Sequence, residues 1–283
     1  MHFIVLSILF YAVNNVLWKK NLLHCSVAFL VVFRAFFTCM GSTALLLYFY
    51  GFDVYTHQPL ARITLGSVFG MMGLFCMLFV LKKAPLQWLG IYNLSGIFFT
   101  ALYLYFFENS RLFDSLAGLA LIVLGFGFYI YHNREQAIKL RLAQHVSLFC
   151  MTVFFGISSL IHWKNLGSDV PPLFIIANQE LVVFVSALVV YFSTSKNNHI
   201  GGLISSHLYP VLQMALVIFF ALYFSFLGLG ATNPVVSSIL FLATPLLTIL
   251  FGALFFKERI SSVNIATIAI IAVGAFILHY QSS

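Results

Sequence analysis

Residues 234–256 read PVVSSILFLATPLLTILFGALFF, residues 257–259 read KER, and residues 260–280 read ISSVNIATIAIIAVGAFILHY. Each apolar run is close to the ~20 residues that an α-helix needs to cross the hydrocarbon core of a bilayer. Only three charged residues separate the two runs. The pattern therefore predicts two membrane-spanning helices joined by a short loop.

The rest of the chain has the same character. Of its 283 residues, 62% are apolar and 7% are charged, whereas an average soluble domain has about 45–50% and about 25%. The apolar runs are continuous and not alternating, which favours helices over an outer-membrane barrel. The composition predicts a multi-pass protein of the bacterial inner or plasma membrane, embedded in the lipid bilayer. The basic residues behind the net charge of +7 stand between the apolar runs, so we expect no nucleic-acid partner.

Charged residues divide the chain into ten apolar stretches. Apart from Asp114 at the very start of one stretch, only Arg34 and Glu180 carry a charge inside a stretch. We expect ten transmembrane helices at about 2–18, 26–50, 63–81, 86–107, 113–131, 144–161, 171–193, 207–228, 234–256 and 262–280.

The loops between these stretches differ in positive charge. The odd-numbered loops hold ten Lys and Arg residues and the even-numbered loops hold three. Because positive loops resist translocation, the odd loops are expected on the cytoplasmic side, with both termini outside.

The two halves of the chain resemble each other. A shift of 149 residues pairs Pro85 with Pro234 and Gly125 with Gly274. Two halves of five spans each must have opposite orientations, because five is odd. The fold class is therefore predicted to be all-α and integral to the membrane, with ten transmembrane helices arranged as two inverted five-helix repeats. The repeats are expected at 1–142 and 143–283.

The end of the second half carries the most specific pattern. Pro234 opens span nine, Pro245 lies within it, the pair Glu258-Arg259 follows it, and Gly274 lies in span ten. With these residues the chain resembles the EamA-type members of the drug/metabolite transporter superfamily. The resemblance implies a ten-span secondary transporter of small metabolites, often amino acids or their analogues, with spans five and ten at the periphery.

Arg34 and Glu180 lie about 12 and 13 Å deep in spans two and seven, at 1.5 Å per residue. These spans are equivalent in the repeat and enter from opposite faces, so both charges come near the midplane. A charge at this depth faces a cavity or a partner. Three interpretations stay open: a structural salt bridge between the halves, contact with the substrate or a coupling proton, or a charge at a water-filled vestibule.

The two prolines of span nine are candidate hinges. Pro245 should kink the helix and free a carbonyl near Phe241, while Pro234 opens the span. A freed carbonyl can also bind a substrate amine or an ion. The alternative is an ordinary transmembrane proline without a role in transport.

Amide, hydroxyl and ring side chains in the expected cavity-lining spans suit an amphipathic metabolite, because rings hold its apolar part and amides align its polar ends. The alternative is that the rings anchor span ends at the interface, with His162 as such an interfacial residue, and that Asn and Ser bond neighbouring helices. The candidate substrate-binding residues are Asn15, Trp18, Arg34, Trp88, Tyr92, Asn93, His162, Gln179, Glu180, Tyr223, Ser237 and Ser238. A wider set of polar and aromatic residues in the same spans also contains Asn14, Tyr103, Ser158, Ser159, Asn178 and Thr244.

Gly66, Gly70 and Gly73 form a small-residue stripe in span three. Such a stripe favours close packing against another helix without saying which one.

The sequence lacks a GxGxxG, Walker or HExxH motif, and its four cysteines are far apart. We therefore expect no cofactor, no metal site and no enzymatic activity. The predicted function is export or exchange of a small organic metabolite by alternating access, driven by protons, another ion or the substrate gradient, in a monomer or homodimer. Two alternatives remain: a membrane assembly or lipid-binding subunit that does not transport, and an intramembrane enzyme.

Overall fold

The computed structural model of the chain describes residues 2–82, 84–86, 88, 89, 92, 96, 106, 116–132, 140–194, 200–231, 243–258 and 262–282. Throughout these ranges the regular secondary structure is helical. The helices are α1 (His2–Leu22), α2 (Val27–Tyr50), α3 (Val54–His57), α4 (Leu60–Leu81), α6 (Leu116–His132), α8 (Leu142–Leu166), α9 (Pro172–Thr194), α10 (Ile200–Gly230), α12 (Ala243–Phe256) and α13 (Ser262–Ser282).

Each expected span other than 86–107, which lies mostly outside the described residues, carries one of these helices. Helix α10 differs most from its predicted span, because it begins at Ile200 and not at 207 and continues through Pro210. Gly201, Gly202 and two serines lower the hydropathy of this first part, so the sequence pattern did not include it in the span. The four-residue helix α3 in the loop after α2 was not expected.

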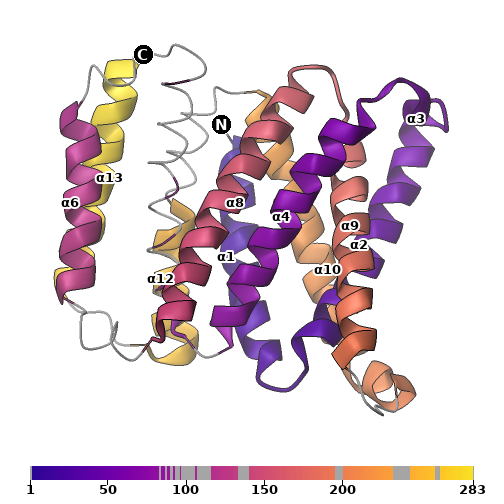
Figure 1. Ribbon diagram of the computed structural model, residues 1–283, viewed down its shortest axis with the longest axis horizontal. Helices are drawn as coiled ribbons and strands as arrows, with labels where there is room; N and C mark the ends of the chain where they lie inside the picture. Colours follow the sequence, from indigo (N-terminus) through magenta and orange to yellow (C-terminus); the bar gives the residue numbers. More distant parts are fainter. Residues whose placement is uncertain are drawn as a thin grey trace.

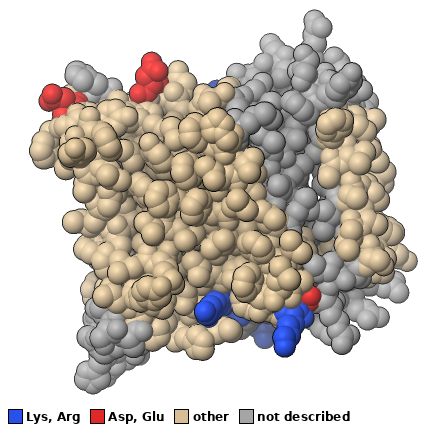
Figure 2. All heavy atoms as spheres, turned by 180° about the vertical axis from the view of Figure 1, so that it is seen from behind, with Lys and Arg blue, Asp and Glu red and all other residues tan. Residues whose placement is uncertain are grey.

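Six helices in the described part of the chain are long and apolar enough to cross a membrane: α1, α2, α4, α8, α9 and the part of α10 from His207 to Gly230. Shorter apolar segments lie in α12 and α13. Figure 2 shows Lys and Arg atoms at the lower rim of one face of the molecule, below a broad belt without charged atoms. The protein is thus a multi-pass helical membrane protein.

The central helices pack as pairs from the two halves of the chain. The main contacts join α4 to α8, α2 to α9, and α1 to α10 (Figure 1). Helices α6 and α13 form a further pair, which stands at one edge of the molecule. The described core therefore consists of helices from one half packed against helices from the other.

The glycine stripe of α4 faces α8. A Cβ atom added to Gly66 would lie 2.7 Å from the ring of His162, one on Gly70 would lie 3.1 Å from Ser158 Oγ, and one on Gly73 would lie 2.7 Å from the ring of Phe155. The absence of side chains thus lets α4 approach α8 closely. The packing predicted from the stripe is confirmed, and its partner is α8.

Two clusters of buried apolar side chains occupy opposite ends of the helix assembly. One includes Trp18, Leu22 and Phe29, where α1 ends and α2 begins. The other includes Phe174 near the start of α9 and Leu229 near the end of α10. A hollow centre between these two ends is left for the polar residues described next.

Candidate functional site

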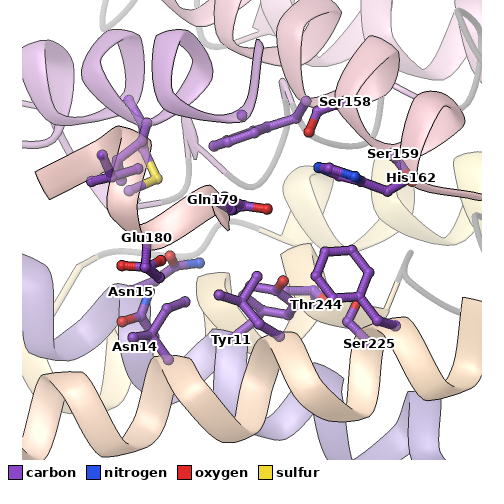
Figure 3. A pocket seen from close by; sticks show the side chains of 18 of the residues that line it. Tyr11, Asn14, Asn15, Ser158, Ser159, His162, Gln179, Glu180, Ser225 and Thr244 are labelled. Carbon is purple, nitrogen blue, oxygen red and sulfur yellow. The ribbon is translucent and has the colours of Figure 1, made fainter. Parts of the chain in front are cut away.

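A cavity of about 320 Å³ lies among the central helices. Its volume falls within the ~300–1,000 Å³ range of pockets that bind small molecules. Figure 3 shows Asn14, Asn15 and Glu180 toward one end of the cavity and Ser158, Ser159 and His162 toward the other. Apolar groups such as Phe155 and Leu222 complete the wall, so the cavity is amphipathic along its length.

Arg34 and Glu180 form a buried ion pair in the wall of this cavity. Arg34 Nη2 lies 2.9 Å from Glu180 Oε2, and Arg34 Nη1 donates to Oε1 over 3.1 Å. Both side chains are 2% exposed. The guanidinium also stands over the ring of Trp18, 5.7 Å from its centroid. The pair joins α2 to α9 and adds no net charge to the site.

Hydrogen bonds fix several polar side chains around the pair. Asn15 Nδ2 donates to Thr248 Oγ1 on α12 over 3.1 Å. Tyr11 and Ser225, on α1 and α10, are also hydrogen-bonded to each other. These bonds tie helices from both halves of the chain around the cavity.

Apart from the two atoms that face each other in the ion pair, four buried polar atoms of cavity-lining residues have no hydrogen-bond partner among the described residues. They are Asn14 Oδ1, Arg34 Nε, His162 Nε2 and Thr244 Oγ1. A buried polar atom without a partner costs about 1–3 kcal/mol. A bound polar molecule that satisfies these atoms would recover that free energy, so the wall is suited to bind one.

A second ion pair lies outside the cavity, where α1 and α12 end. Lys19 Nζ donates to Glu258 Oε1, which also accepts the backbone N–H of Leu86 over 3.0 Å. Lys19 also stands over the ring of Phe256, 5.0 Å from its centroid. We call Lys19, Leu86 and Glu258 the clasp. The clasp connects the ends of α1 and α12 to the start of expected span four.

The backbone after α12 positions the acidic residue of the clasp. Lys257 has a φ of 54°, a left-handed conformation that commonly ends a helix. The chain therefore turns back, and Glu258 N–H donates to Gly252 O over 3.3 Å. Gly252 has room for this approach only because it lacks a side chain: an added Cβ would lie 2.7 Å from Glu258 Oε2.

The structure brings half of the predicted substrate-binding residues together. Those that line the cavity are Asn15, Trp18, Arg34, His162, Gln179 and Glu180. Residues from the wider polar set also line it, namely Asn14, Ser158, Ser159 and Thr244.

Three predicted residues lie elsewhere. Tyr92 Oη is 2.8 Å from His145 Nδ1, and Trp88 packs edge-on against the same histidine at 5.8 Å. Tyr223 stacks on Phe219 with ring centroids 6.0 Å apart. Trp88 and Tyr92 thus contact α8, Tyr223 stacks within α10, and none of the three lines the cavity. Spacing along a helix can place side chains on one face, but the neighbouring helices determine which face borders the cavity.

Asn93, Ser237, Ser238 and Pro234 lie outside the described residues. Pro245 lies in the first described turn of α12. Its role as a hinge stays a prediction.

Sequence reasoning missed Tyr11, Thr152 and Ser225 among the polar lining residues. All three stand in strongly apolar spans, where a single tyrosine, threonine or serine is common and carries no positional signal. In the described part of the chain, no group of three or more His, Cys, Asp and Glu side chains is placed to hold a metal ion.

Comparisons with known proteins agree with this architecture. A solved crystal structure is similar over 98% of this chain and 98% of its own, with a TM-score of 0.70 and 16% sequence identity. At this identity the similarity shows the fold alone. No curated protein sequence gives a match. The model of the EamA-like transporter family matches residues 144–280. Over this second half the chain is similar to the EamA-like transporters, the family that the sequence pattern indicated.

Proposed function

We propose that this protein is a ten-helix secondary transporter that exports or exchanges a small amphipathic metabolite, an amino acid or a similar compound, by alternating access. The observation that carries the proposal is the central cavity, whose wall contains two opposite charges that neutralise each other. Arg34 and Glu180 come from α2 and α9 and are almost fully buried. A charge pair at this depth is expensive unless it serves a site or holds two elements together.

The pattern of helix contacts supports two inverted repeats. If the first five spans correspond to the last five, α1 corresponds to α8, α2 to α9, α4 to α10 and α6 to α13. The contact of α4 with α8 then exchanges with that of α1 with α10. The contacts of α2 with α9 and of α6 with α13 map onto themselves. This is the pattern that a two-fold axis between the halves produces, and such an axis gives alternating access its two equivalent gates.

The clasp supports a gate on one side of the cavity. Lys19 and Glu258 hold the ends of α1 and α12 together at the end of the molecule that carries Lys20 and Lys82. The charge distribution between loops predicts that this end is cytoplasmic. The clasp would therefore be closed while substrate exchanges with the opposite side, and it would open when the two halves rock past each other.

The lining supports an amphipathic substrate without net charge. The formal charges of Arg34 and Glu180 cancel, and the other polar groups of the described wall are amides, hydroxyls and the His162 ring. A zwitterionic amino acid suits this arrangement, because its ammonium and carboxylate groups find partners in the pair and the amides while its side chain contacts the rings. Protons remain a candidate coupling ion, with Glu180 as the group that would carry them.

The hollow centre argues against the alternative of a non-transporting assembly or lipid-binding subunit. Such a subunit needs no cavity and no matched gates. A dry and solid centre would favour it, whereas this centre is a cavity lined by amides and hydroxyls.

Thermal stabilisation followed by counterflow tests the proposal. The purified chain would be melted with each member of a panel of amino acids, nucleosides and sugars, because a ligand that binds only the folded form raises the melting temperature. Each stabilising compound would then be tested for counterflow in proteoliposomes. We expect at least one neutral amphipathic compound to stabilise the chain and to exchange.

Two variants make the test specific. Asn15→Leu removes a cavity amide and should abolish both signals, whereas Ser193→Ala, at an exposed position near the end of α9, should preserve both. Stabilisation without counterflow for every compound, or an unchanged response in Asn15→Leu, would contradict transport through this cavity.

A further inference from the structure

The His162 end of the cavity contains a chain of hydrogen bonds that leads outward. Arg62 Nε donates to Asn165 Oδ1, and Arg62 Nη2 donates to Ser168 Oγ over 3.0 Å. Asn165 Nδ2 lies 3.5 Å from His162 Nδ1. Asn165 is 0% exposed and His162 is 1% exposed. The chain of bonds therefore connects the start of α4 to the cavity through buried side chains of α8.

The direction of each bond in this chain follows from donor chemistry. A guanidinium can only donate, so the amide oxygen of Asn165 must face Arg62. The amide nitrogen of Asn165 then faces His162 Nδ1 and donates to it. An accepting Nδ1 carries no proton, which leaves the ring neutral with its proton on Nε2. A doubly protonated ring would set an N–H group against the amide donor.

The Nε2–H group is buried in the cavity wall and has no hydrogen-bond acceptor among the described residues. Ser158 Oγ, one turn away on α8, donates to Gly66 O over 2.8 Å. The edge of Phe226 supports the His162 ring, with the two ring centroids 5.4 Å apart. Gly66 leaves space for the ring, because a Cβ there would lie 3.0 Å from Nε2. The ring is therefore fixed, and Figure 3 shows it reaching into the cavity from α8.

We propose that His162 determines specificity by donating one hydrogen bond from Nε2 to the substrate. The substrate then carries an acceptor at this end, such as a carbonyl, carboxylate, ether or sulfoxide oxygen. Arg62 and Asn165 are positioning residues that hold the tautomer. The inference deepens the proposed transport function and rests on it, because only a transporter of this kind has a substrate in the cavity. The position of the proton on His162 can be tested without any ligand.

Nitrogen NMR of the full-length chain in nanodiscs, with ¹⁵N-labelled histidine rings, tests the donor directly. The signals of His162 are those that disappear in His162→Gln. We expect a protonated Nε2 and an unprotonated Nδ1. Asn165→Asp places an acceptor beside Nδ1 and should move a proton to that nitrogen, whereas His24→Gln, in the loop after α1, should leave the His162 signals unchanged. A proton on Nδ1 in the unmodified chain would overturn the assignment.

A matched pair of probes tests the specificity. 4-Acetyl-L-phenylalanine and 4-isopropyl-L-phenylalanine have nearly the same shape, but only the first carries a carbonyl acceptor. We expect the acetyl compound to bind about tenfold more tightly, as one neutral hydrogen bond allows. The preference should disappear in His162→Leu, remain in His162→Gln, whose amide reaches the Nε2 position, and remain in His24→Gln.

Equal binding of the two probes, or tighter binding of the isopropyl compound, would overturn the proposal about specificity. If neither probe stabilises the chain, the amino-acid class under the proposed function is contradicted. The NMR result then still decides whether His162 presents a donor, so the two failures are distinguishable.

Discussion

The two ion pairs of this protein differ in depth and in what holds them. Arg34 and Glu180 meet between α2 and α9 with side chains 2% exposed. Lys19 and Glu258 meet at the end of α1 with side chains 17% and 11% exposed. Water can compete for the second pair but not for the first. Under the proposed alternating access, we therefore expect the deep pair to hold the two halves together more strongly than the clasp, which is weak enough to open.

Replacing Arg34 by Met should have the largest effect, because Glu180 would remain buried without its partner. We expect a loss of about 3–5 kcal/mol in the free energy of unfolding. The double variant Arg34→Met/Glu180→Met should recover most of that loss, since no unpaired charge remains. Thermal and denaturant unfolding in bicelles would measure both.

The same double variant separates the alternatives for the deep pair. If it folds well and still catalyses counterflow, the pair is a structural salt bridge only. If it folds well and is inactive, one or both charges contact the substrate or a coupling proton. A single Arg34→Met variant as stable as the original chain would show that the pair does not hold α2 to α9.

Glu258→Gln should have an intermediate effect, confined to the gate. The change removes the charge that Lys19 contacts, and a partly exposed pair is worth up to about 1 kcal/mol. This free energy corresponds to about a fivefold shift toward the state open on the clasp side. A cysteine placed at Asn15, in a chain without other cysteines, should react faster with a membrane-impermeant thiol reagent added from that side.

The matched control for the gate is Asp169→Asn. Asp169 is an exposed carboxylate at the opposite end of the molecule, with a φ of 57° that asparagine tolerates. Its labelling rate should equal that of the original chain. The clasp would not control access if Asp169→Asn also accelerated labelling of the cysteine at position 15, or if Glu258→Gln did not accelerate it.

Gly252→Ala should have the smallest effect. The new methyl group would lie 2.7 Å from Glu258 Oε2, and the flexible carboxylate can move aside at little cost to the fold. We expect an unchanged melting temperature within about 2 °C, because a change well below 1 kcal/mol shifts it little, together with a small rise in labelling at Asn15. Gly41→Ala, where an added Cβ meets nothing within 4 Å, should change neither. A large loss of stability in Gly252→Ala would mean that Glu258 is held rigidly.

The sequence was most informative where one residue type has one physical meaning. Buried charges are rare in membrane helices, so Arg34 and Glu180 were singled out by their depth and equivalent spans, with a salt bridge as one of three interpretations, and the structure pairs them. The glycine stripe of α4 predicted close packing for the same reason. His162 was ambiguous, because an interfacial ring and a cavity ring have the same sequence signal. Trp88 and Tyr92 were assigned to the cavity, but their rings pack against His145.

Composition and charge by themselves determined that this chain is a multi-pass helical membrane protein, because no other environment accepts so much continuous apolar sequence. They also located the helices and the two buried charges. Only the tertiary structure decided which helices pack together, because the sequence of a helix that is apolar on all sides does not indicate which face contacts which neighbour. The cavity, the clasp, and the chain of bonds from Arg62 to His162 all depend on that choice of neighbours.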